Sequence, residues 1–380
     1  MVKVMADDPE EGMLSWDESV FREEHVFEID YVPETFKHRE SQTQSLQYAL
    51  RPAVRGSRPL NVMARGPPGT GKTTSVQKLF DELSAQTDVR TVRVNCQVDS
   101  TRYAIFSRIF EGIFDYEPPS SGISFKKLFR QITDKLVEED EVLVVALDDV
   151  NYLFYEGEAS DTLYSLLRAH EAHSGAKIGV IVVSSDLNLD VIEELDTRVQ
   201  SVFRPEDVYF PVYDRQEIVD ILGERVKRGF HEGVIGPDVL ERVAELTAES
   251  GDLRVGIDLL RRAGLNAEMR ASRTVSLQDV EDAYEKSKFV HLSHSLHALS
   301  ENEVALVRVI AEHDGEQAGE VYDVFHEETD LGYTRYSEII NKVDQLGIID
   351  ATYTNVDGRG RSRSLSLRYD PEAVLARLDD

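Results

Sequence analysis

Nine consecutive residues near position 70 have the composition and spacing of a phosphate-binding loop. The run GPPGTGKTT matches G-x-x-x-x-G-K-[ST], follows a predicted strand and opens a predicted helix, which is the context that this motif needs. Its glycines allow tight turns, so that backbone N–H groups and the helix N-terminus can face phosphate oxygens. Lys72 would then contact the β and γ phosphates, and Thr73 would hold Mg²⁺. The nucleotide-binding candidates in this run are Gly66, Pro67, Pro68, Gly69, Thr70, Gly71, Lys72, Thr73 and Thr74.

An acidic pair ends a second apolar run, VLVVALDDV. A buried strand that ends in carboxylates makes Asp148 the candidate to support Mg²⁺ and Asp149 the candidate base for an attacking water. Strands often end in Asp because turns favour it, so this pattern by itself leaves both interpretations open. Together with the loop at Gly66 it predicts an ATP site with Lys72, Asp148 and Asp149 as catalytic residues.

The elements that must position these residues change in kind along the chain. Between residues 31 and 212, β-rich runs alternate with helical patterns, which predicts a parallel α/β sheet covered by helices. Residues 213–290 carry amphipathic helical patterns without a strand signal and predict a small all-helical domain. Residues 291–380 predict three helices and then two paired strands, the order of a winged helix. Residues 1–30 are acidic and weakly patterned, and we expect an extended arm. The strands of the sheet are expected at 60–66, 89–95, 141–149, 177–185 and 206–213.

A basic island lies in the predicted hairpin of the last domain. Arg359, Arg361 and Arg363 alternate around the turn DGRGR in a chain whose formal net charge is −29. The glycines of this turn let the backbone approach a groove, and guanidinium groups suit phosphates or a narrowed minor groove. The island therefore predicts a contact with DNA.

The predicted helix before the hairpin, TRYSEIINKVDQLG, has the position of a recognition helix. We expect Arg335, Tyr336 and Lys342 to face away from its apolar side and to contact DNA. An ordinary amphipathic helix has the same spacing, and the basic hairpin is what favours the DNA interpretation.

Composition restricts the setting of the protein. The 71 acidic residues against 42 basic ones resemble proteins from cytoplasms of very high salt, where screening acts over about 3 Å at 1 M and local charge outweighs total charge. We therefore interpret the acidity as adaptation to salt and not as an argument against DNA binding. A cytoplasmic, nucleoid-associated protein without a membrane partner is expected, because no long apolar run or secretory signal is present. The single cysteine, Cys96, excludes an internal disulfide.

The motifs together resemble those of the archaeal replication initiators of the origin-recognition and cell-division-control type, within the AAA+ ATPases. The resemblance rests on GPPGTGKT, LDD, the helical domain with GDLR and the terminal winged helix, and it runs from VFEIDYVPETFKHRE to the hairpin. It implies an AAA+ parallel-sheet P-loop domain, a small helical lid and a winged-helix DNA-binding domain. It also implies ATP or ADP with Mg²⁺ as ligands, and origin DNA, further initiator copies and a replicative helicase as partners.

The resemblance implies roles for further residues. YVPETFKHRE is similar to the segment that covers the adenine, and GDLR to the lid turn whose arginine meets the γ-phosphate. The stretch LDTRVQSVFRPEDVYFPVY is similar to the one that carries an arginine finger, which implies Arg198, with Arg204 as the alternative. The nucleotide-side residues implied in this way are Val32, Pro33, His38, Arg39, Tyr213, Arg225 and Arg254.

Two positions depart from the family pattern, and one insertion follows it. Most members carry Asp-Glu where Asp148 and Asp149 stand, and Asn where Ser185 stands. The shorter Asp149 and the missing amide of Ser185 imply slow hydrolysis and a nucleotide-state switch. The helix in DSTRYAIFSRIFEGIF falls where these initiators insert a DNA-contacting helix. Its candidates are Arg102, Tyr103 and Arg108.

The combined interpretation is a slow ATPase that recognises replication-origin DNA and regulates initiation. One alternative is a transcription regulator that couples an ATPase switch to a winged helix. Another is a clamp-loader-like ATPase that acts on a protein partner, in which a basic winged helix is not expected.

Overall fold

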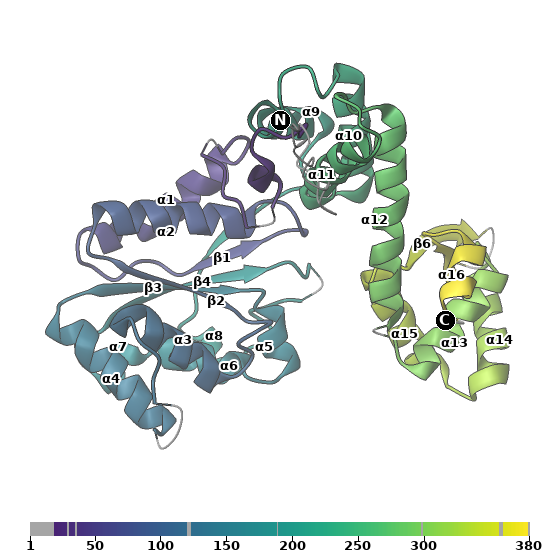
Figure 1. Cartoon of the computed structure of the whole chain (residues 1–380). Helices are drawn as coiled ribbons and strands as arrows, with labels where there is room; N and C mark the ends of the chain where they lie inside the picture. Colours follow the sequence, from purple (N-terminus) through teal and green to yellow (C-terminus); the bar gives the residue numbers. More distant parts are fainter. Residues whose placement is uncertain are drawn as a thin grey trace, which may run out of the picture. The chain divides into compact units, whose positions relative to one another are not determined.

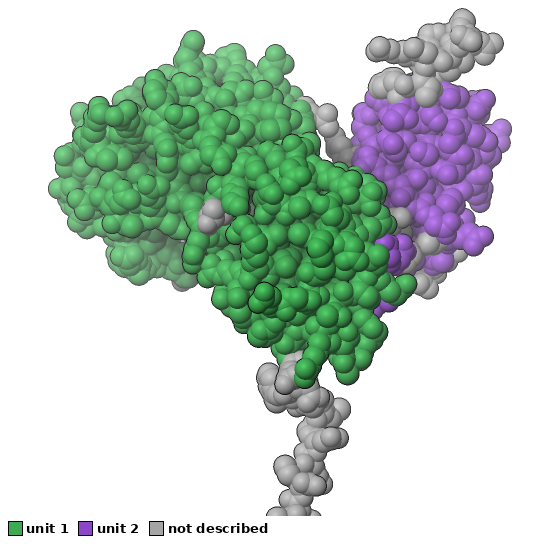
Figure 2. Space-filling model, turned by 90° about the horizontal axis from the view of Figure 1, so that it is seen from above, with its two compact units in different colours: residues 1–280 green, residues 281–380 purple. Residues whose placement is uncertain are grey.

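The computed structural model describes residues 19–28, 30–34, 36–119, 123–187, 189–297, 299–356 and 360–378. The chain divides into two compact units, residues 1–280 and 281–380, which are coloured separately in Figure 2. The first unit contains the sheet and the helical lid, and the second contains the winged helix.

The first unit is built on a five-stranded parallel sheet with the strand order β2-β3-β4-β1-β5. Each predicted strand is confirmed, and each sits inside its expected range. The strands are β1 (Val62–Arg65), β2 (Arg90–Asn95), β3 (Val142–Asp148), β4 (Lys177–Ser184) and β5 (Glu206–Tyr209). All seven residues of β3 are buried, as expected for a central strand of a parallel sheet.

Helices cover both faces of this sheet (Figure 1). Leu143, Val145 and Leu147 of β3 belong to the apolar cluster on the side of α3, α4 and α6. The alternate residues of β3, such as Val144, belong to the cluster with α1 and α2. Because successive side chains of a strand point to opposite faces, a strand buried on both faces reads as one continuous apolar run. The helices are α1 (Glu40–Val54), α2 (Lys72–Gln86), α3 (Arg102–Phe114), α4 (Phe125–Glu138), α5 (Asn151–Tyr155), α6 (Ala159–Leu167), α7 (Ala169–Ala172) and α8 (Thr197–Gln200).

The lid consists of helices that follow β5, as the helical patterns after residue 213 predict. Asp214 begins α9 with a capping box in which its side chain accepts from the N–H of Glu217. The lid helices are α9 (Arg215–Gly229), α10 (Pro237–Ser250), α11 (Leu253–Met269) and the first part of α12 (Leu277–His297).

The N-terminal segment from residue 19 packs on the lid, so the expectation of an extended arm is wrong for residues 19–28. A short 3₁₀ helix, η1 (Glu24–Phe27), lies in this segment. Phe21 is buried, and its ring stacks on Phe230 at 4.8 Å between centroids. A Cβ on Gly264 would stand 2.3 Å from the ring of Phe21, so the glycine leaves the space that this ring fills. The aromatic residues of this segment contribute to the lid core because the free energy gained by burying their rings outweighs the preference of the neighbouring acidic residues for solvent.

The second unit contains the three predicted helices and the predicted antiparallel hairpin. Its elements are the rest of α12, α13 (Glu301–Glu312), α14 (Ala318–Thr329), α15 (Tyr333–Gln345), β6 (Ile349–Val356), β7 (Gly360–Leu367) and a further helix, α16 (Pro371–Leu378). Ile349 of β6 pairs with Leu367 of β7, and the pairing continues to Val356 and Gly360. The expected domain boundary at residue 290 falls inside α12, which runs without interruption across it. Within the described ranges, no helix combines the length and apolar character needed to cross a membrane.

Candidate nucleotide site and DNA-binding surface

The phosphate loop lies at the C-terminal edge of the sheet, between β1 and α2. Gly69 and Gly71 have left-handed φ values of 67° and 87°. A Cβ on Gly69 would stand 1.8 Å from Oδ1 of Asp252, and a Cβ on Gly71 would stand 2.8 Å from the hydroxyl of Tyr213. Both positions therefore need glycine, for conformation and for space. The close approach of Asp252 also brings the lid turn GDLR against the phosphate loop.

Lys72 is held inside this loop. Its side chain is buried, and Nζ donates to the carbonyls of Gly66 and Pro67, each at 2.7 Å. Burial, together with the nearby charge of Arg254, lowers the pKa of Lys72 to about 8. The ammonium group thus lacks a full counter-charge, which a bound phosphate would supply.

The expected Mg²⁺ ligands lie next to one another. The hydroxyl of Thr73 donates to Oδ1 of Asp148 at 3.0 Å. Burial and the neighbouring Asp149 raise the pKa of Asp148. A hydroxyl and a carboxylate beside a phosphate loop are the oxygen ligands that Mg²⁺ prefers, so the residues present fit this ion.

Arg93 also contacts the carboxylate of Asp148, which the sequence interpretation missed. Its guanidinium lies 3.2 Å from Oδ2 of Asp148. In the sequence, Arg93 stands out only because it alternates with Val92 and Val94 in the edge strand RTVRVN. The two valines are buried and Arg93 is exposed.

Asp149 and Ser185 come together beyond the end of β3. The hydroxyl of Ser185 donates to Oδ1 of Asp149 at 3.4 Å, and Asp149 has a left-handed backbone with φ of 52°. The two residues expected to orient the attacking water are therefore in contact with each other.

The segment expected to cover the adenine is fixed to α2. Nζ of Lys78 donates to the carbonyls of Pro33 at 3.0 Å and Glu34 at 2.5 Å. Val32 and Pro33 are half-buried. Lys78 had no motif that could have marked it, because its partners are backbone carbonyls.

His38 lies between this segment and the lid. It has a left-handed φ of 61°, and its Nε2 lies 3.3 Å from a carboxylate oxygen of Asp220 on α9. Glu217 is the second carboxylate nearby, at 3.8 Å from Nδ1. His38 thus contacts the lid helix directly.

Arg39 is buried, and it connects the loop to the lid junction through backbone groups. Its guanidinium donates to the carbonyls of Thr70 at 2.9 Å, His38 at 2.7 Å and Pro211 at 2.6 Å. It also lies over the ring of Tyr213, with Cζ 3.5 Å from the centroid. Burial lowers the pKa of Arg39. The structure thus gives Arg39 contacts that position the phosphate loop.

The two lid arginines occupy different surroundings. Arg254 is exposed, and its backbone N–H donates to Oδ1 of Asp252 at 2.8 Å at the start of α11. Its positive charge is close enough to lower the pKa of Lys72. Arg225 instead donates to the carbonyls of Val26 and Tyr31, and Cζ lies 4.5 Å from the ring of Tyr31. Burial lowers the pKa of Arg225 to about 10. The structure therefore brings Arg254 to the phosphate loop, and it brings Arg225 to Val26 and to Tyr31, the first residue of the segment expected to cover the adenine.

Arg198 lies on α8 at the surface of the AAA+ domain. Its guanidinium donates to Asp161 at 2.7 Å and to Asp196 at 2.8 Å. Asp161 also lies 3.6 Å from the guanidinium of Arg102. The charge of Arg198 is thus balanced inside the chain while about half of its side chain is exposed.

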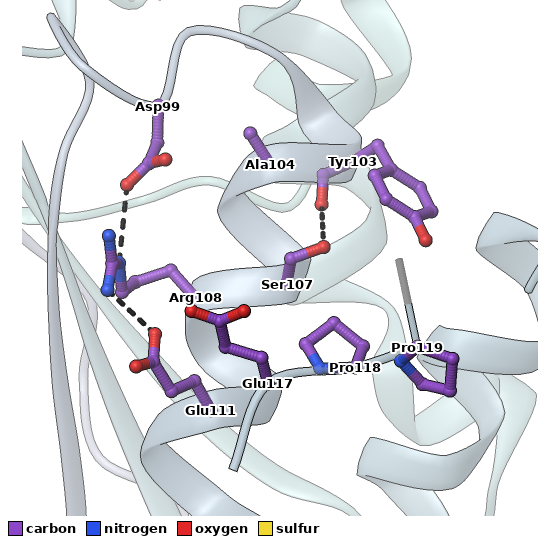
Figure 3. A pocket seen from close by; sticks show the side chains of 9 residues that line it. All are labelled: Asp99, Tyr103, Ala104, Ser107, Arg108, Glu111, Glu117, Pro118 and Pro119. Carbon is purple, nitrogen blue, oxygen red and sulfur yellow. Dashed lines mark hydrogen bonds and ion pairs between the residues drawn. The ribbon is translucent and has the colours of Figure 1, made fainter. Parts of the chain in front are cut away.

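Two of the three candidates on α3, Tyr103 and Arg108, line an acidic depression, and Arg102 does not. Arg102 lies over the ring of Phe125, at 4.2 Å, and the hydroxyl of Tyr103 donates to Ile123 at 3.4 Å. Arg108 pairs with Asp99 at 3.4 Å and with Glu111 at 2.7 Å (Figure 3). The depression has a volume of 290 Å³, and its lining consists of Asp99, Tyr103, Ala104, Ser107, Arg108, Glu111, Glu117, Pro118 and Pro119. Its carboxylates offset the charge that Arg108 would offer to a phosphate.

Tyr336 is a core residue, so the prediction that it faces away from the apolar side of α15 is wrong. Its exposure is 0%, and its hydroxyl donates to the carbonyl of Ala318 at 2.6 Å. Its ring lies 5.4 Å from that of Phe325. Residue 336 shares the helical face of Ile340 and Val343, which is the buried face. A tyrosine can occupy such a face because a single backbone acceptor is enough to satisfy its hydroxyl.

Other candidate DNA-binding residues already have partners on the protein. Arg335 pairs with Glu338 at 2.8 Å, and Lys342 pairs with the buried Glu303 at 2.9 Å. Arg363 donates to Oδ1 of Asn341 at 2.7 Å. Arg359 lies outside the described residues. Arg361 is described by its backbone alone, which pairs with Asn355 in the hairpin.

The strand order, the phosphate loop after β1, the carboxylates at the end of β3 and the helical lid define an AAA+ P-loop protein. Residues 55–190 match the family described as AAA domain, and residues 219–285 match the Cdc6 AAA+ ATPase-type lid domain.

Curated relatives identify the family more closely. ORC1-type DNA replication protein 3 of Haloarcula marismortui is 79% identical over 375 residues, which cover 98% of this chain and 100% of that protein. ORC1-type DNA replication protein 2 of Methanosarcina acetivorans is 51% identical over 364 residues, with coverages of 96% and 97%. The chain belongs to the family of ORC1-type DNA replication proteins, the archaeal replication initiators.

A solved structure supports the same assignment. The ORC1 protein of Aeropyrum pernix in complex with DNA is 28% identical, has a TM-score of 0.75, and is covered over 97% of its length by 96% of this chain. Among the relatives, those from Haloarcula marismortui and Halobacterium salinarum, at 79% and 71% identity, are from halophilic archaea, which agrees with the interpretation of the acidity.

The state of Lys72 predicts that ATP affinity depends on pH. Phosphate oxygens favour the charged ammonium, so ATP binding should raise the pKa of Lys72 above its value of about 8 in the protein without nucleotide. Above pH 8, binding should therefore be accompanied by uptake of a proton. The Kd for ATP should stay constant below pH 8 and then rise, toward about tenfold per pH unit. Calorimetric titrations at pH 7 and pH 9, each in two buffers of different ionisation enthalpy, measure both quantities.

The control is Lys72→Arg, whose guanidinium stays protonated in this range. It should bind ATP with no proton uptake at pH 9. A wild-type Kd that stays flat up to pH 9.5, without proton uptake, would contradict the assigned state of Lys72.

Proposed function

We propose that this chain is an ATP-dependent initiator that binds double-stranded origin DNA through its winged helix and changes conformation between ATP-bound and ADP-bound states. The observation that carries the proposal is the contact between the phosphate loop and the lid, where Gly69 meets Asp252 and Arg254 lies near Lys72. A nucleotide held by this loop would contact both parts at once.

The residues of the site have distinct tasks in this proposal. Lys72 leaves the carbonyls of Gly66 and Pro67 and pairs with the β and γ phosphates. Thr73 and Asp148 supply oxygen ligands for Mg²⁺, which neutralises phosphate charge when bound. Arg254 meets the γ-phosphate, where a planar cation stabilises the charge of the transition state.

Hydrolysis needs a water that is oriented from the other side. Asp149 accepts a proton from this water, and Ser185, which contacts Asp149, helps to position it. Arg198 acts on the nucleotide of a neighbouring copy after it leaves Asp161 and Asp196. The side chains of Asp149 and Ser185 are both short, so hydrolysis is slow. The conformation of the protein then depends on which nucleotide is bound.

The nucleotide state reaches the lid through Arg39. This residue joins the carbonyl of Thr70 in the phosphate loop, the carbonyl of Pro211 after β5 and the ring of Tyr213. Asp214, the next residue, begins the first lid helix. A shift of the loop is therefore transmitted to the start of α9.

The partners in this proposal follow from the family and from the second unit. They are double-stranded origin DNA, further initiator copies and a replicative helicase, all in the cytoplasm at the nucleoid.

Genomic occupancy separates this proposal from a transcription regulator with the same domains. Chromatin immunoprecipitation and sequencing of the tagged full chain should give peaks at one or a few replication origins. Peaks that are scattered over promoters, with none at an origin, would exclude the initiator role.

Slow hydrolysis leads to a second prediction. Turnover by the wild-type chain should stay below about one per second, and the change Ser185→Asn together with Asp149→Glu should raise it about tenfold or more. Release of phosphate in single-turnover and steady-state assays measures this. Ser84→Asn, at an exposed position on the far part of α2, serves as the matched control and should leave turnover unchanged. A wild-type rate well above one per second would rule out the switch.

The basic hairpin predicts electrostatic contacts with DNA. The double change Arg359→Ala and Arg361→Ala should weaken binding to all duplexes and reduce the slope of log K against log salt by about 2, because each phosphate contact contributes about 0.9. Fluorescence anisotropy across a salt series measures both effects, and ATP affinity should not change. Arg130→Ala on α4, whose side chain is 79% exposed, is the control. Equal losses of DNA and ATP binding would mean that these arginines are structural.

A further inference from the structure

The exposed side of α15 carries few free positive charges. Its buried side consists of Tyr336, Ile339, Ile340 and Val343. Thr334, Glu338 and Asn341 are exposed, and their spacing of four and three residues puts them on one stripe of the helix. A carboxylate in the middle of this stripe repels phosphates, and its pairing with Arg335 offsets one positive charge. The stripe therefore suits hydrogen bonding to base edges better than contact with the DNA backbone.

Asn341 is held in place by the hairpin. The guanidinium of Arg363 on β7 donates to its Oδ1 at 2.7 Å. A carbonyl oxygen has two lone pairs, so Oδ1 retains one acceptor position while the NH₂ group retains its donors. The bond thus fixes the orientation of the Asn341 amide and leaves it able to form further hydrogen bonds. Asparagine is a poor residue for a helix interior, so helix stability does not explain its presence here.

Arg363 projects from a part of the hairpin that is itself anchored. Two residues later on the same face of β7, Leu365 is fully buried in the core of the second unit. The residue between them, Ser364, bridges to Gln317 and its hydroxyl donates to the carbonyl of Gly315. The guanidinium therefore starts from a fixed point, and Asn341 receives a defined geometry.

We propose that Asn341 reads an adenine edge in the major groove and that Arg363 is the positioning residue for its amide. Asparagine can accept from the adenine N6 amino group and donate to N7, a pair of bonds that no other base offers in this arrangement. This assignment rests on the proposed binding of origin DNA by the winged helix. It separates Arg363, which would act through Asn341, from Arg359 and Arg361, which would contact the DNA backbone.

Selection from a random duplex library tests this without knowledge of the natural site. The full chain with ATP is bound to the library, and the recovered DNA is sequenced for the wild type, Asn341→Ala, Arg363→Ala and the double variant. With Asn341→Ala, the preference for adenine at one position of the enriched motif should fall about tenfold or more, as expected for one lost bidentate pair. Arg363→Ala should weaken the preference at that same position, and the double variant should be no worse there than Asn341→Ala.

Controls separate this role from a structural one or a phosphate contact. Glu327→Ala, at an exposed position of α14, should keep the wild-type motif, and all variants should keep the wild-type Tm. A motif that Asn341→Ala leaves intact would overturn the inference and leave the proposed function standing. A uniform loss of affinity in Arg363→Ala, with the motif unchanged and a salt slope lower by about 1, would make Arg363 a phosphate contact and would also overturn it. Absence of any enriched motif with the wild type would overturn the proposed recognition of origins and this inference together.

Discussion

The nucleotide half of this protein depends on one buried guanidinium. Arg39 is 2% exposed, and it donates to the carbonyls of His38 beside it, Thr70 in the phosphate loop and Pro211 in the segment that leads into the lid. A buried charge of this kind is tolerated when hydrogen bonds to backbone and contact with an aromatic ring replace its hydration. Because the three segments are far apart in the sequence, their common partner fixes their relative positions. The hydrogen bonds from Arg39 to these backbone carbonyls therefore help to hold the motif residues of the site in place.

The charged groups of the nucleotide site have partners within the protein itself. Lys72 uses loop carbonyls, and Asp148 uses Thr73 and Arg93. Burial still lowers the pKa of Lys72 and raises that of Asp148, so these partners do not fully replace the lost hydration of either group. In the proposed function, binding of nucleotide and Mg²⁺ would exchange these protein partners for phosphate and metal partners. An ordered site of this kind loses less conformational freedom when it binds.

The sequence predicted those features that rest on local patterns. The five strands follow from apolar runs, and the phosphate loop follows from a motif with a defined backbone geometry. Features that depend on tertiary partners were missed or misassigned. Tyr336 was given the wrong face because a single acceptor on another helix buries it, and Lys78 has carbonyl partners that no residue spacing can indicate. The bond between Arg363 and Asn341 joins a strand to a helix, so no pattern within either segment predicts it, although the basic island marks Arg363 itself.

The balanced charge of Arg198 has a consequence for assembly. The guanidinium of Arg198 already donates to Asp161 and Asp196. To bind the nucleotide of a neighbouring copy, it would have to give up these ion pairs. The free energy gained would therefore be only the difference between the new ion pairs and the old ones. Exposed ion pairs of this kind contribute little to binding, and they contribute less in concentrated salt. In the proposed contact between copies, Arg198 would then contribute little when the proteins are free in solution. Two copies bound to adjacent stretches of one duplex experience a much higher effective concentration, so the spacing of binding sites on the DNA would control which copies meet.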